Sequence, residues 1–289
     1  MDGITFSAHR DKEETKGHVS EKDGNDSALQ NMIISGSGAL GIATGAAVGT
    51  LVAGPAGTLI GAATGALLQD GMKSVAGDIA SRFTAETERE RMGAVYILAQ
   101  SQVVQRLNDG KKPRSASFFR PRERKKGKIL RAEAEELLEG TFLAAQNAFE
   151  ERKIELLANF YTNVVFRDDL DSSHAAYILS LLESLTYRQL ISVVVIGNGT
   201  LMNAIRTRDF RGGGGLEPLQ VGVLFELYQL VKLDLVTDAD ASYILGVADI
   251  NPSRLRLQGT GTELFKLMAP LALDFDDYGY FVNAFQPIH

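Results

Sequence analysis

The chain has no cysteine and no tryptophan, and only four histidines among its 289 residues. Without cysteine, disulfide frameworks, thiolate zinc sites and cysteine nucleophiles are excluded. The histidines, at 9, 18, 174 and 289, are too scattered for two imidazoles to face one metal from a single helix. Phosphate-binding loops, serine-hydrolase elbows and zinc-peptidase motifs are also missing. The sequence therefore predicts no catalytic, cofactor or metal site, and a protein that is not an enzyme.

Charge is absent from residues 27–69, a stretch of 43 residues that is rich in glycine and alanine and is called the glycine segment below. Residues 1–26 before it are charged and polar, and are expected to form a disordered tail. They lack the basic start and short apolar core of a secretory signal, so none is expected. The remainder of the chain is apolar enough, at 45% over the whole sequence, to bury a core.

The glycines of this segment follow a four-residue period, which places them on one face of a helix. They are Gly41, Gly45, Gly49, Gly57, Gly61 and Gly65. Residues 41–46 (GIATGA) recur at 61–66 (GAATGA), which indicates two copies of one unit. Between the copies, Gly54 and Pro55 are typical of a tight turn. The segment therefore predicts a helical hairpin with two nearly bare faces, against which other helices can pack closely.

This pattern resembles the glycine zippers of membrane-active bacterial proteins. The first arm, residues 29–53, is long enough to span a bilayer, whereas the second is charge-free for only 14 residues, 56–69. The resemblance implies a hairpin over 27–83 that inserts conditionally or as an oligomer. Three alternatives stay open: a soluble glycine-alanine hairpin, flexible low-complexity sequence, and a dinucleotide fingerprint at 36–41. The last lacks the acidic residue expected about 20 positions later, because the next acid is Asp70.

A basic window, residues 111–131, holds ten lysines and arginines and one acid, although the whole chain carries a net charge of −6. Its densest cations, with Phe118 and Phe119 beside them, are Arg120, Arg122, Arg124, Lys125, Lys126 and Lys128. On a chain with a membrane segment, such a cluster predicts binding to anionic lipid headgroups. Nucleic-acid phosphates are the rival partner, and a solvated loop with no partner is the third reading.

Helical periodicity governs most of the rest. Amphipathic helices are expected over 70–107, 129–166 and 174–184, the last capped by Ser172 or Ser173. Three acids precede that cap, Asp168, Asp169 and Asp171. They are interpreted as a loop that caps the helix, with a metal site as the weaker alternative.

The C-terminal pattern is helix 185–196, a glycine joint at 212–215, a helix from Pro218 to about 232, strands near 243–247 and 255–257, and a helix over 257–268. It looks like a winged-helix domain. The tail from about residue 150 also resembles the C-terminal part of Abi-alpha abortive-infection proteins, which implies a role in phage defence. Residues 216–250 hold six acids against Lys232, so a protein partner or dimer is favoured over DNA.

The predicted fold is mainly α: a glycine-zipper hairpin (27–83), a helix and basic linker (84–128), and a helical domain (129–289) that ends in a winged-helix-like α+β element. The domain over 129–289 is expected to fold alone. The predicted function is a non-enzymatic effector at the bacterial inner membrane, on its cytoplasmic face, with lipids and further copies of itself as partners. The alternative is a soluble winged-helix regulator that binds nucleic acid through 111–131.

Overall fold

The computed structural model describes residues 63–80, 82, 85–124, 128–203, 215–238, 244, 246–268 and 275–285. The tail at 1–26 and most of the glycine segment lie outside these residues. So do five of the six predicted packing glycines, the Gly54–Pro55 turn, Lys125 and Lys126. The membrane hairpin therefore stays a prediction.

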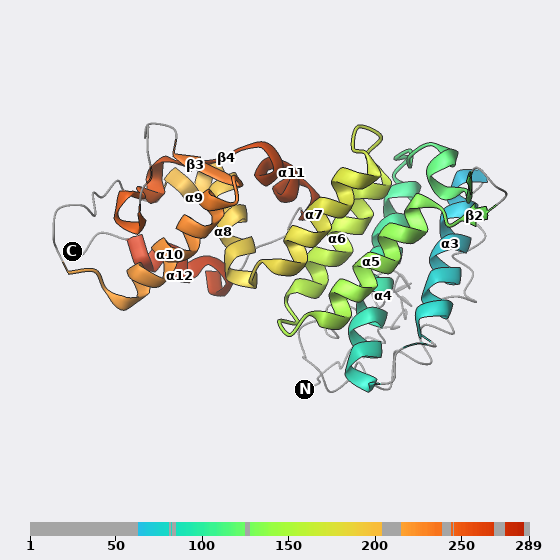
Figure 1. Ribbon diagram of the computed structural model, residues 1–289, viewed down its shortest axis with the longest axis horizontal. Coiled ribbons are helices and arrows are strands. Elements are labelled where there is room, and N and C mark those ends of the chain that lie inside the picture. Colours follow the sequence, from blue (N-terminus) through green and yellow to red (C-terminus); the bar gives the residue numbers. More distant parts are fainter. Residues whose placement is uncertain are drawn as a thin grey trace, which may run out of the picture.

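The described chain is mainly helical, with two small antiparallel sheets, as the sequence predicts. Figure 1 shows two lobes, with helices α3 to α7 side by side in one and helices α8, α9, α10 and α12 in the other. The helical lobe contains α3 (Ala63–Ala80), α4 (Glu86–Asn108), η2 (Ala116–Phe119), β1 (Arg122–Arg124), β2 (Lys128–Leu130), α5 (Glu133–Asn147), α6 (Lys153–Val165) and α7 (Ser172–Ser184). The C-terminal lobe contains α8 (Tyr187–Gly197), α9 (Gly199–Asn203), α10 (Pro218–Lys232), β3 (Val236–Asp238), η3 (Val247–Asp249), η4 (Pro252–Arg254), β4 (Leu255–Leu257), α11 (Gly259–Met268) and α12 (Phe275–Phe285).

Helix α6 is the centre of the helical lobe. Every residue of it is buried except Glu155, which is the pattern of a helix enclosed on all sides. Its polar side chains have partners: Asn159 accepts a hydrogen bond from Gln102 at 2.6 Å, and Asn163 accepts one from Arg106 at 2.6 Å. Both donors belong to α4, so α4 is attached to α6 by hydrogen bonds as well as by apolar contact.

The helices are shorter than the periodicity predicts. The helix expected over 70–107 is two helices, α3 and α4, with a break at residues 81–85. The helix expected over 129–166 is strand β2 followed by α5 and α6, and Phe149 at the break between these helices is 79% exposed. Two short helices fold back on each other and bury both apolar stripes, whereas one long helix would leave most of its stripe uncovered.

The caps of two helices are defined by side chains. Helix α7 is capped by Asp171 instead of Ser172 or Ser173: its Oδ1 accepts hydrogen bonds from the backbone N–H groups of Ser173 and His174 at 2.9 and 3.0 Å. A carboxylate at this position also interacts favourably with the positive end of the helix dipole. Helix α8 begins with a capping box, in which Thr186 and Gln189 each bond to the other's backbone N–H.

The strand expected near 243–247 is wrong in its described part, because Val247–Asp249 is a 3₁₀ turn. The partner of β4 is β3, which pairs with it antiparallel. The chain turns into β3 at Asp234, which lies just after the end of α10. The φ of this residue, 55°, is in the left-handed region, in which a helix cannot continue. The strand at 255–257 is confirmed. Helix α12 was not predicted.

The contacts run across the boundaries that composition suggested at residues 84 and 129. Helix α3 contacts α5, and α4 contacts both α5 and α6. Helix α4 contributes Val95, Tyr96, Ala99 and Val103, each at most 1% exposed. The core of the helical lobe thus includes residues on both sides of 129.

Among the described residues, no single helix has the length and apolarity to cross a bilayer, although α7 and α8 meet both criteria as a pair bent by 119°.

Candidate functional site

The glycine segment enters the described structure as the start of α3. The buried side of this helix is a continuous stripe that repeats every three or four residues. The stripe consists of Gly65, Leu68, Met72, Val75, Ala76 and Ile79. Gly65, the last of the predicted packing glycines, is therefore buried on this side of α3, and α3 as a whole packs on η2, α4 and α5. We call this surface the α3 docking site.

Four charged side chains connect the end of α3 to α5. Arg82 lies 2.6 Å from Asp78 and 2.9 Å from Glu139, and Arg131 pairs with the same two carboxylates. The hydrogen bond from Arg131, with the nearby charge of Arg82, holds the pKa of Asp78 below its ordinary value. We call Asp78, Arg82, Arg131 and Glu139 the α3 clamp.

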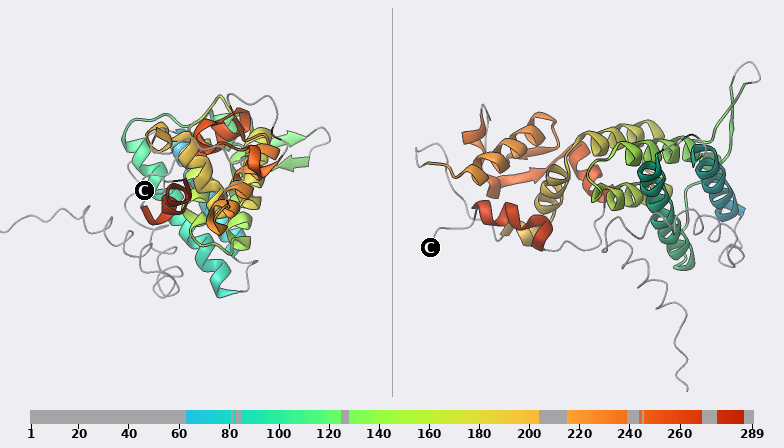
Figure 2. Two further views of the ribbon diagram at one scale, coloured as in Figure 1. Left: turned by 90° about the vertical axis from the view of Figure 1, so that its left-hand side faces the viewer. Right: turned by 90° about the horizontal axis from the view of Figure 1, so that it is seen from below.

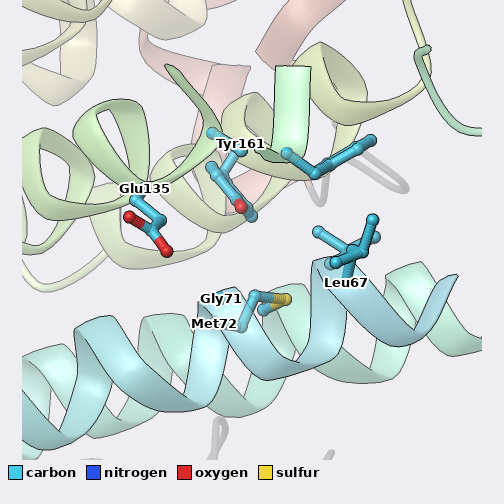
Figure 3. A pocket seen from close by; sticks show the side chains of 8 residues that line it. Leu67, Gly71, Met72, Glu135 and Tyr161 are labelled. Carbon is cyan, nitrogen blue, oxygen red and sulfur yellow. The ribbon is translucent and has the colours of Figure 1, made fainter. Parts of the chain in front are cut away.

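A small cavity lies under the first half of α3, and Figure 3 shows Tyr161 and Glu135 on one side of it and Leu67, Gly71 and Met72 of α3 on the other. Its volume is about 10 Å³, the room of one water molecule. Burial raises the pKa of the Tyr161 hydroxyl, and the charge of Glu135 adds to this effect. This cavity is too small for a metabolite, so the docking site is a surface between helices.

The aromatic residues of the basic window belong to the core. Phe118 and Phe119 are 3% and 5% exposed, and their rings meet edge to face at 5.0 Å. The Arg114 guanidinium covers the Phe118 ring at 4.0 Å. The interpretation of 111–131 as an exposed linker is therefore wrong at Phe118 and Phe119, and these two rings are not available to a lipid surface.

The cations of the window divide into two groups. Arg122 pairs with Glu133 and Glu136, and Arg131 belongs to the α3 clamp. Arg120 is exposed. Arg124 and Lys128 are opposite each other in the backbone register of β1 and β2, the hairpin that Figure 2 shows projecting from the body. The sequence reasoning missed the acids that neutralise part of the window. They could have been found at the start of α5, where Glu133, Glu136 and Glu139 recur every three residues.

The acidic loop before α7 has structural roles. Asp168 accepts a hydrogen bond from the backbone N–H of Ser115 at 3.1 Å, Asp169 pairs with Arg167, and Asp171 caps α7. Within the ranges described, no group of three or more acids and histidines is arranged to hold a metal ion.

A second polar cluster joins the lobes where α6, α8 and α12 meet. Tyr187 donates a hydrogen bond to Asp277 at 2.8 Å, and Arg152 lies 3.3 Å from the same carboxylate. Burial raises the pKa of Glu155, the only position on α6 that is not fully buried, and the charge of Asp277 raises it further. Burial also raises the pKa of the Tyr187 hydroxyl. These groups fix α12 against the helical lobe.

Comparison with known proteins gives no match to a family model, to a curated protein or to a solved structure.

Proposed function

We propose that the protein is a non-enzymatic bacterial effector. Its glycine segment assembles with that of other copies and perturbs the inner membrane from the cytoplasmic face, and the two lobes carry and control that segment. A role in phage defence accompanies this proposal through the resemblance of the C-terminal half to Abi-alpha proteins.

The observation that carries the proposal is the position of α3. This helix begins inside the second copy of the glycine repeat and ends in the α3 clamp. Its buried stripe contains Leu68, Met72 and Ile79, each at most 2% exposed. Burying such side chains stabilises the docked helix by about 1.5–3 kcal/mol each. The glycine segment is therefore joined to the body through a rigid, docked helix instead of a free linker.

This connection suits a control function. A change in the body that weakens the α3 clamp would also free the end of the glycine segment, because both belong to one helix. The soluble alternative, in which the whole hairpin packs on the body, places further glycines in the docking site beside Gly65. The two readings differ in where Gly45 and Gly61 pack, in a membrane assembly or within one chain.

We further assign the C-terminal lobe to a winged-helix-like fold. Helix α10 followed by the antiparallel pair β3 and β4 supports this assignment. Acids outnumber bases around α10, which disfavours the approach of DNA phosphates to this lobe. On the helical lobe, carboxylates already pair with Arg122 and Arg131. A long polyanion laid over the basic window would meet these acids, whereas a single lipid headgroup could bind at the projecting hairpin alone.

Dye release from vesicles of phosphatidylglycerol and phosphatidylethanolamine tests the proposal. The full chain should release the dye, and Gly45→Leu or Gly61→Leu should lower the rate at least tenfold, because a leucine side chain blocks close helix contact. Gly77→Leu is the matched control. Gly77 is exposed on α3, and a side chain added there meets no atom within 4 Å.

Two results would contradict the proposal. Full dye release by both bulky variants would show that the glycine faces do not assemble. Intact vesicles, together with duplex DNA binding that is lost when the basic window is reversed in charge, would replace it with the nucleic-acid regulator.

A further inference from the structure

The outer face of α10 is an apolar stripe open to solvent. Val221 and Phe225 are 45% and 52% exposed, while the opposite face is fully buried through Val223, Leu224 and Leu227. Residues along the centre of the open face are spaced three, four, three and four apart. They are Pro218, Val221, Phe225, Tyr228 and Lys232. This is the spacing by which two helices pack along a common seam.

The ends of this stripe carry opposite charges. Glu217 stands exposed at the N-terminal end, and Lys232 stands exposed at the C-terminal end, where its Nζ lies 5.0 Å from the centre of the Tyr228 ring. In the described part of the chain, neither forms an ion pair. An antiparallel copy of the same helix would place each glutamate beside a lysine, twice over, and would also align the helix dipoles favourably.

The shape of the stripe is self-complementary in the same arrangement. If Phe225 meets its symmetry mate on a two-fold axis, Gly222 lies opposite Tyr228 of the other copy. A side chain added at Gly222 would meet nothing closer than Arg188 at 4.0 Å, so there is room for a ring at this position. The Tyr228 ring of each copy thus faces the bare Gly222 position of the other.

From the spacing, the charges and this fit, we infer that α10 is a docking surface for a second copy of the chain, paired antiparallel about Phe225. The contact is isologous, so it closes at two copies. It is independent of the glycine segment and goes beyond the proposed function: it gives the protein dimers before any membrane assembly. One helix from each copy makes a small interface, and we expect a dissociation constant on the order of 10–100 μM.

The absence of cysteine makes a direct test available. Two single-cysteine variants of the full chain, Val221→Cys and Gln229→Cys, are oxidised separately and as a mixture. Positions 221 and 229 face each other in the antiparallel pair, whereas each is more than one helical turn from its own copy. The mixture should form disulfide-linked dimers at least tenfold faster than either variant alone. Phe149→Cys, at a phenylalanine that is 79% exposed on the other lobe, is the control for random collision.

Charge exchange checks the same geometry. Adding Lys232→Glu to both cysteine variants should slow cross-linking of the mixture several-fold, because two pairs of carboxylates then meet. Adding Glu217→Lys as well should restore the original rate. Equal rates for the mixture, the separate variants and the control would overturn the inference, as would faster linkage within each variant alone, which is the result of a parallel pair. Assembly through the glycine faces does not bring the two α10 helices together, so loss of vesicle activity would leave this test unaffected.

Discussion

In the helical lobe, α3 covers the apolar faces of its neighbours, and the α3 clamp connects its C-terminal end to α5. In the C-terminal lobe, α10 is equally well packed on its inner side, but Val221 and Phe225 remain open to solvent. Helix α3 is rich in glycine and alanine and α10 in leucine and valine, yet it is the more apolar α10 that keeps large side chains open to solvent. The difference teaches that α3 completes a core within one chain, whereas α10 presents a surface that a second chain can complete.

The largest expected effect concerns the cover of the helical lobe. A chain of residues 63–289 should melt cooperatively, whereas a fragment of 129–289 should lack a cooperative transition and aggregate. The shorter fragment loses α3 and α4 and so exposes α6, whose residues other than Glu155 are all buried. Circular dichroism melts with light scattering would measure this. A cooperative melt of 129–289 would restore the sequence-based expectation that this region folds alone.

The second prediction compares charge reversal in the basic window with charge reversal in the C-terminal half of the chain. Changing Arg124, Lys125 and Lys126 to glutamate should weaken binding to anionic vesicles by about fivefold per residue, since each cation near such a surface contributes about 1 kcal/mol. The matched control reverses Arg206, Arg208 and Arg211, three cations in the C-terminal half of the sequence. Equal weakening by both triple variants would mean that total charge, rather than the projecting hairpin, determines binding. Arg122 is left unchanged because its ion pairs with Glu133 and Glu136 contribute to the fold.

Alanine substitutions at two glycines test which faces of the C-terminal lobe are packed and which are open. A methyl group added at Gly261 of α11 would lie 1.9 Å from the carbonyl oxygen of Leu235, so Gly261→Ala should lower the free energy of unfolding by about 1–3 kcal/mol or more. Gly222→Ala on the open face of α10 should raise it by about 0.5–1 kcal/mol, because alanine favours the helix and meets no clash. Urea melts at low protein concentration give both values, and destabilisation of similar size at the two sites would contradict the open face.

The smallest effects concern two carboxylates with opposite pKa shifts. The pKa of Glu155 is raised in the folded protein, so its ionisation costs stability as the pH rises through that value. Glu155→Gln should therefore be more stable than the unchanged chain at pH 7 and equal to it below about pH 4.

The pKa of Asp78 is lowered by Arg131 and Arg82, so its contribution is present above the unfolded value of about 3.9 and is lost as the pH falls through the folded value. Asp78→Asn should accordingly be less stable at pH 7, with the difference shrinking in acid. Chemical denaturation across pH measures both. A carboxylate whose variant shows no dependence on pH would lack the assigned contacts.

Periodicity predicted most helices of the body but not their breaks. The apolar stripe of α5 and α6 continues through Phe149, so no local signal marks the break between the two helices. The chain turns back there because each helix buries its apolar stripe against the other. Only β4 of the pair β3–β4 is predicted, because β3 follows a left-handed residue, Asp234, that is not a glycine and so gives no turn signal in the sequence.

The candidate site was predicted less well than the fold. The period of the glycine segment places Gly65 on the buried side of α3, whereas the predicted packing of the other five glycines lies outside the described residues. The basic window was interpreted from its own residues, without the distant acids that pair with its arginines. Arg131 of this window pairs with Asp78 and Glu139, which are 53 and 8 residues away from it in the sequence. Only the packing of α3 on α5 brings these two acids together.

The most direct test of the account is the partition of two chains expressed in bacteria, the full sequence and residues 63–289, after their membranes are washed with alkaline carbonate. Both contain the described helices, and they differ in residues 1–62, which are the polar tail and the glycine segment up to α3. The account predicts that the full chain stays in the membrane pellet and that 63–289 is released to the supernatant. Release of both chains, or retention of both, would contradict the claim that the glycine segment is what engages the membrane.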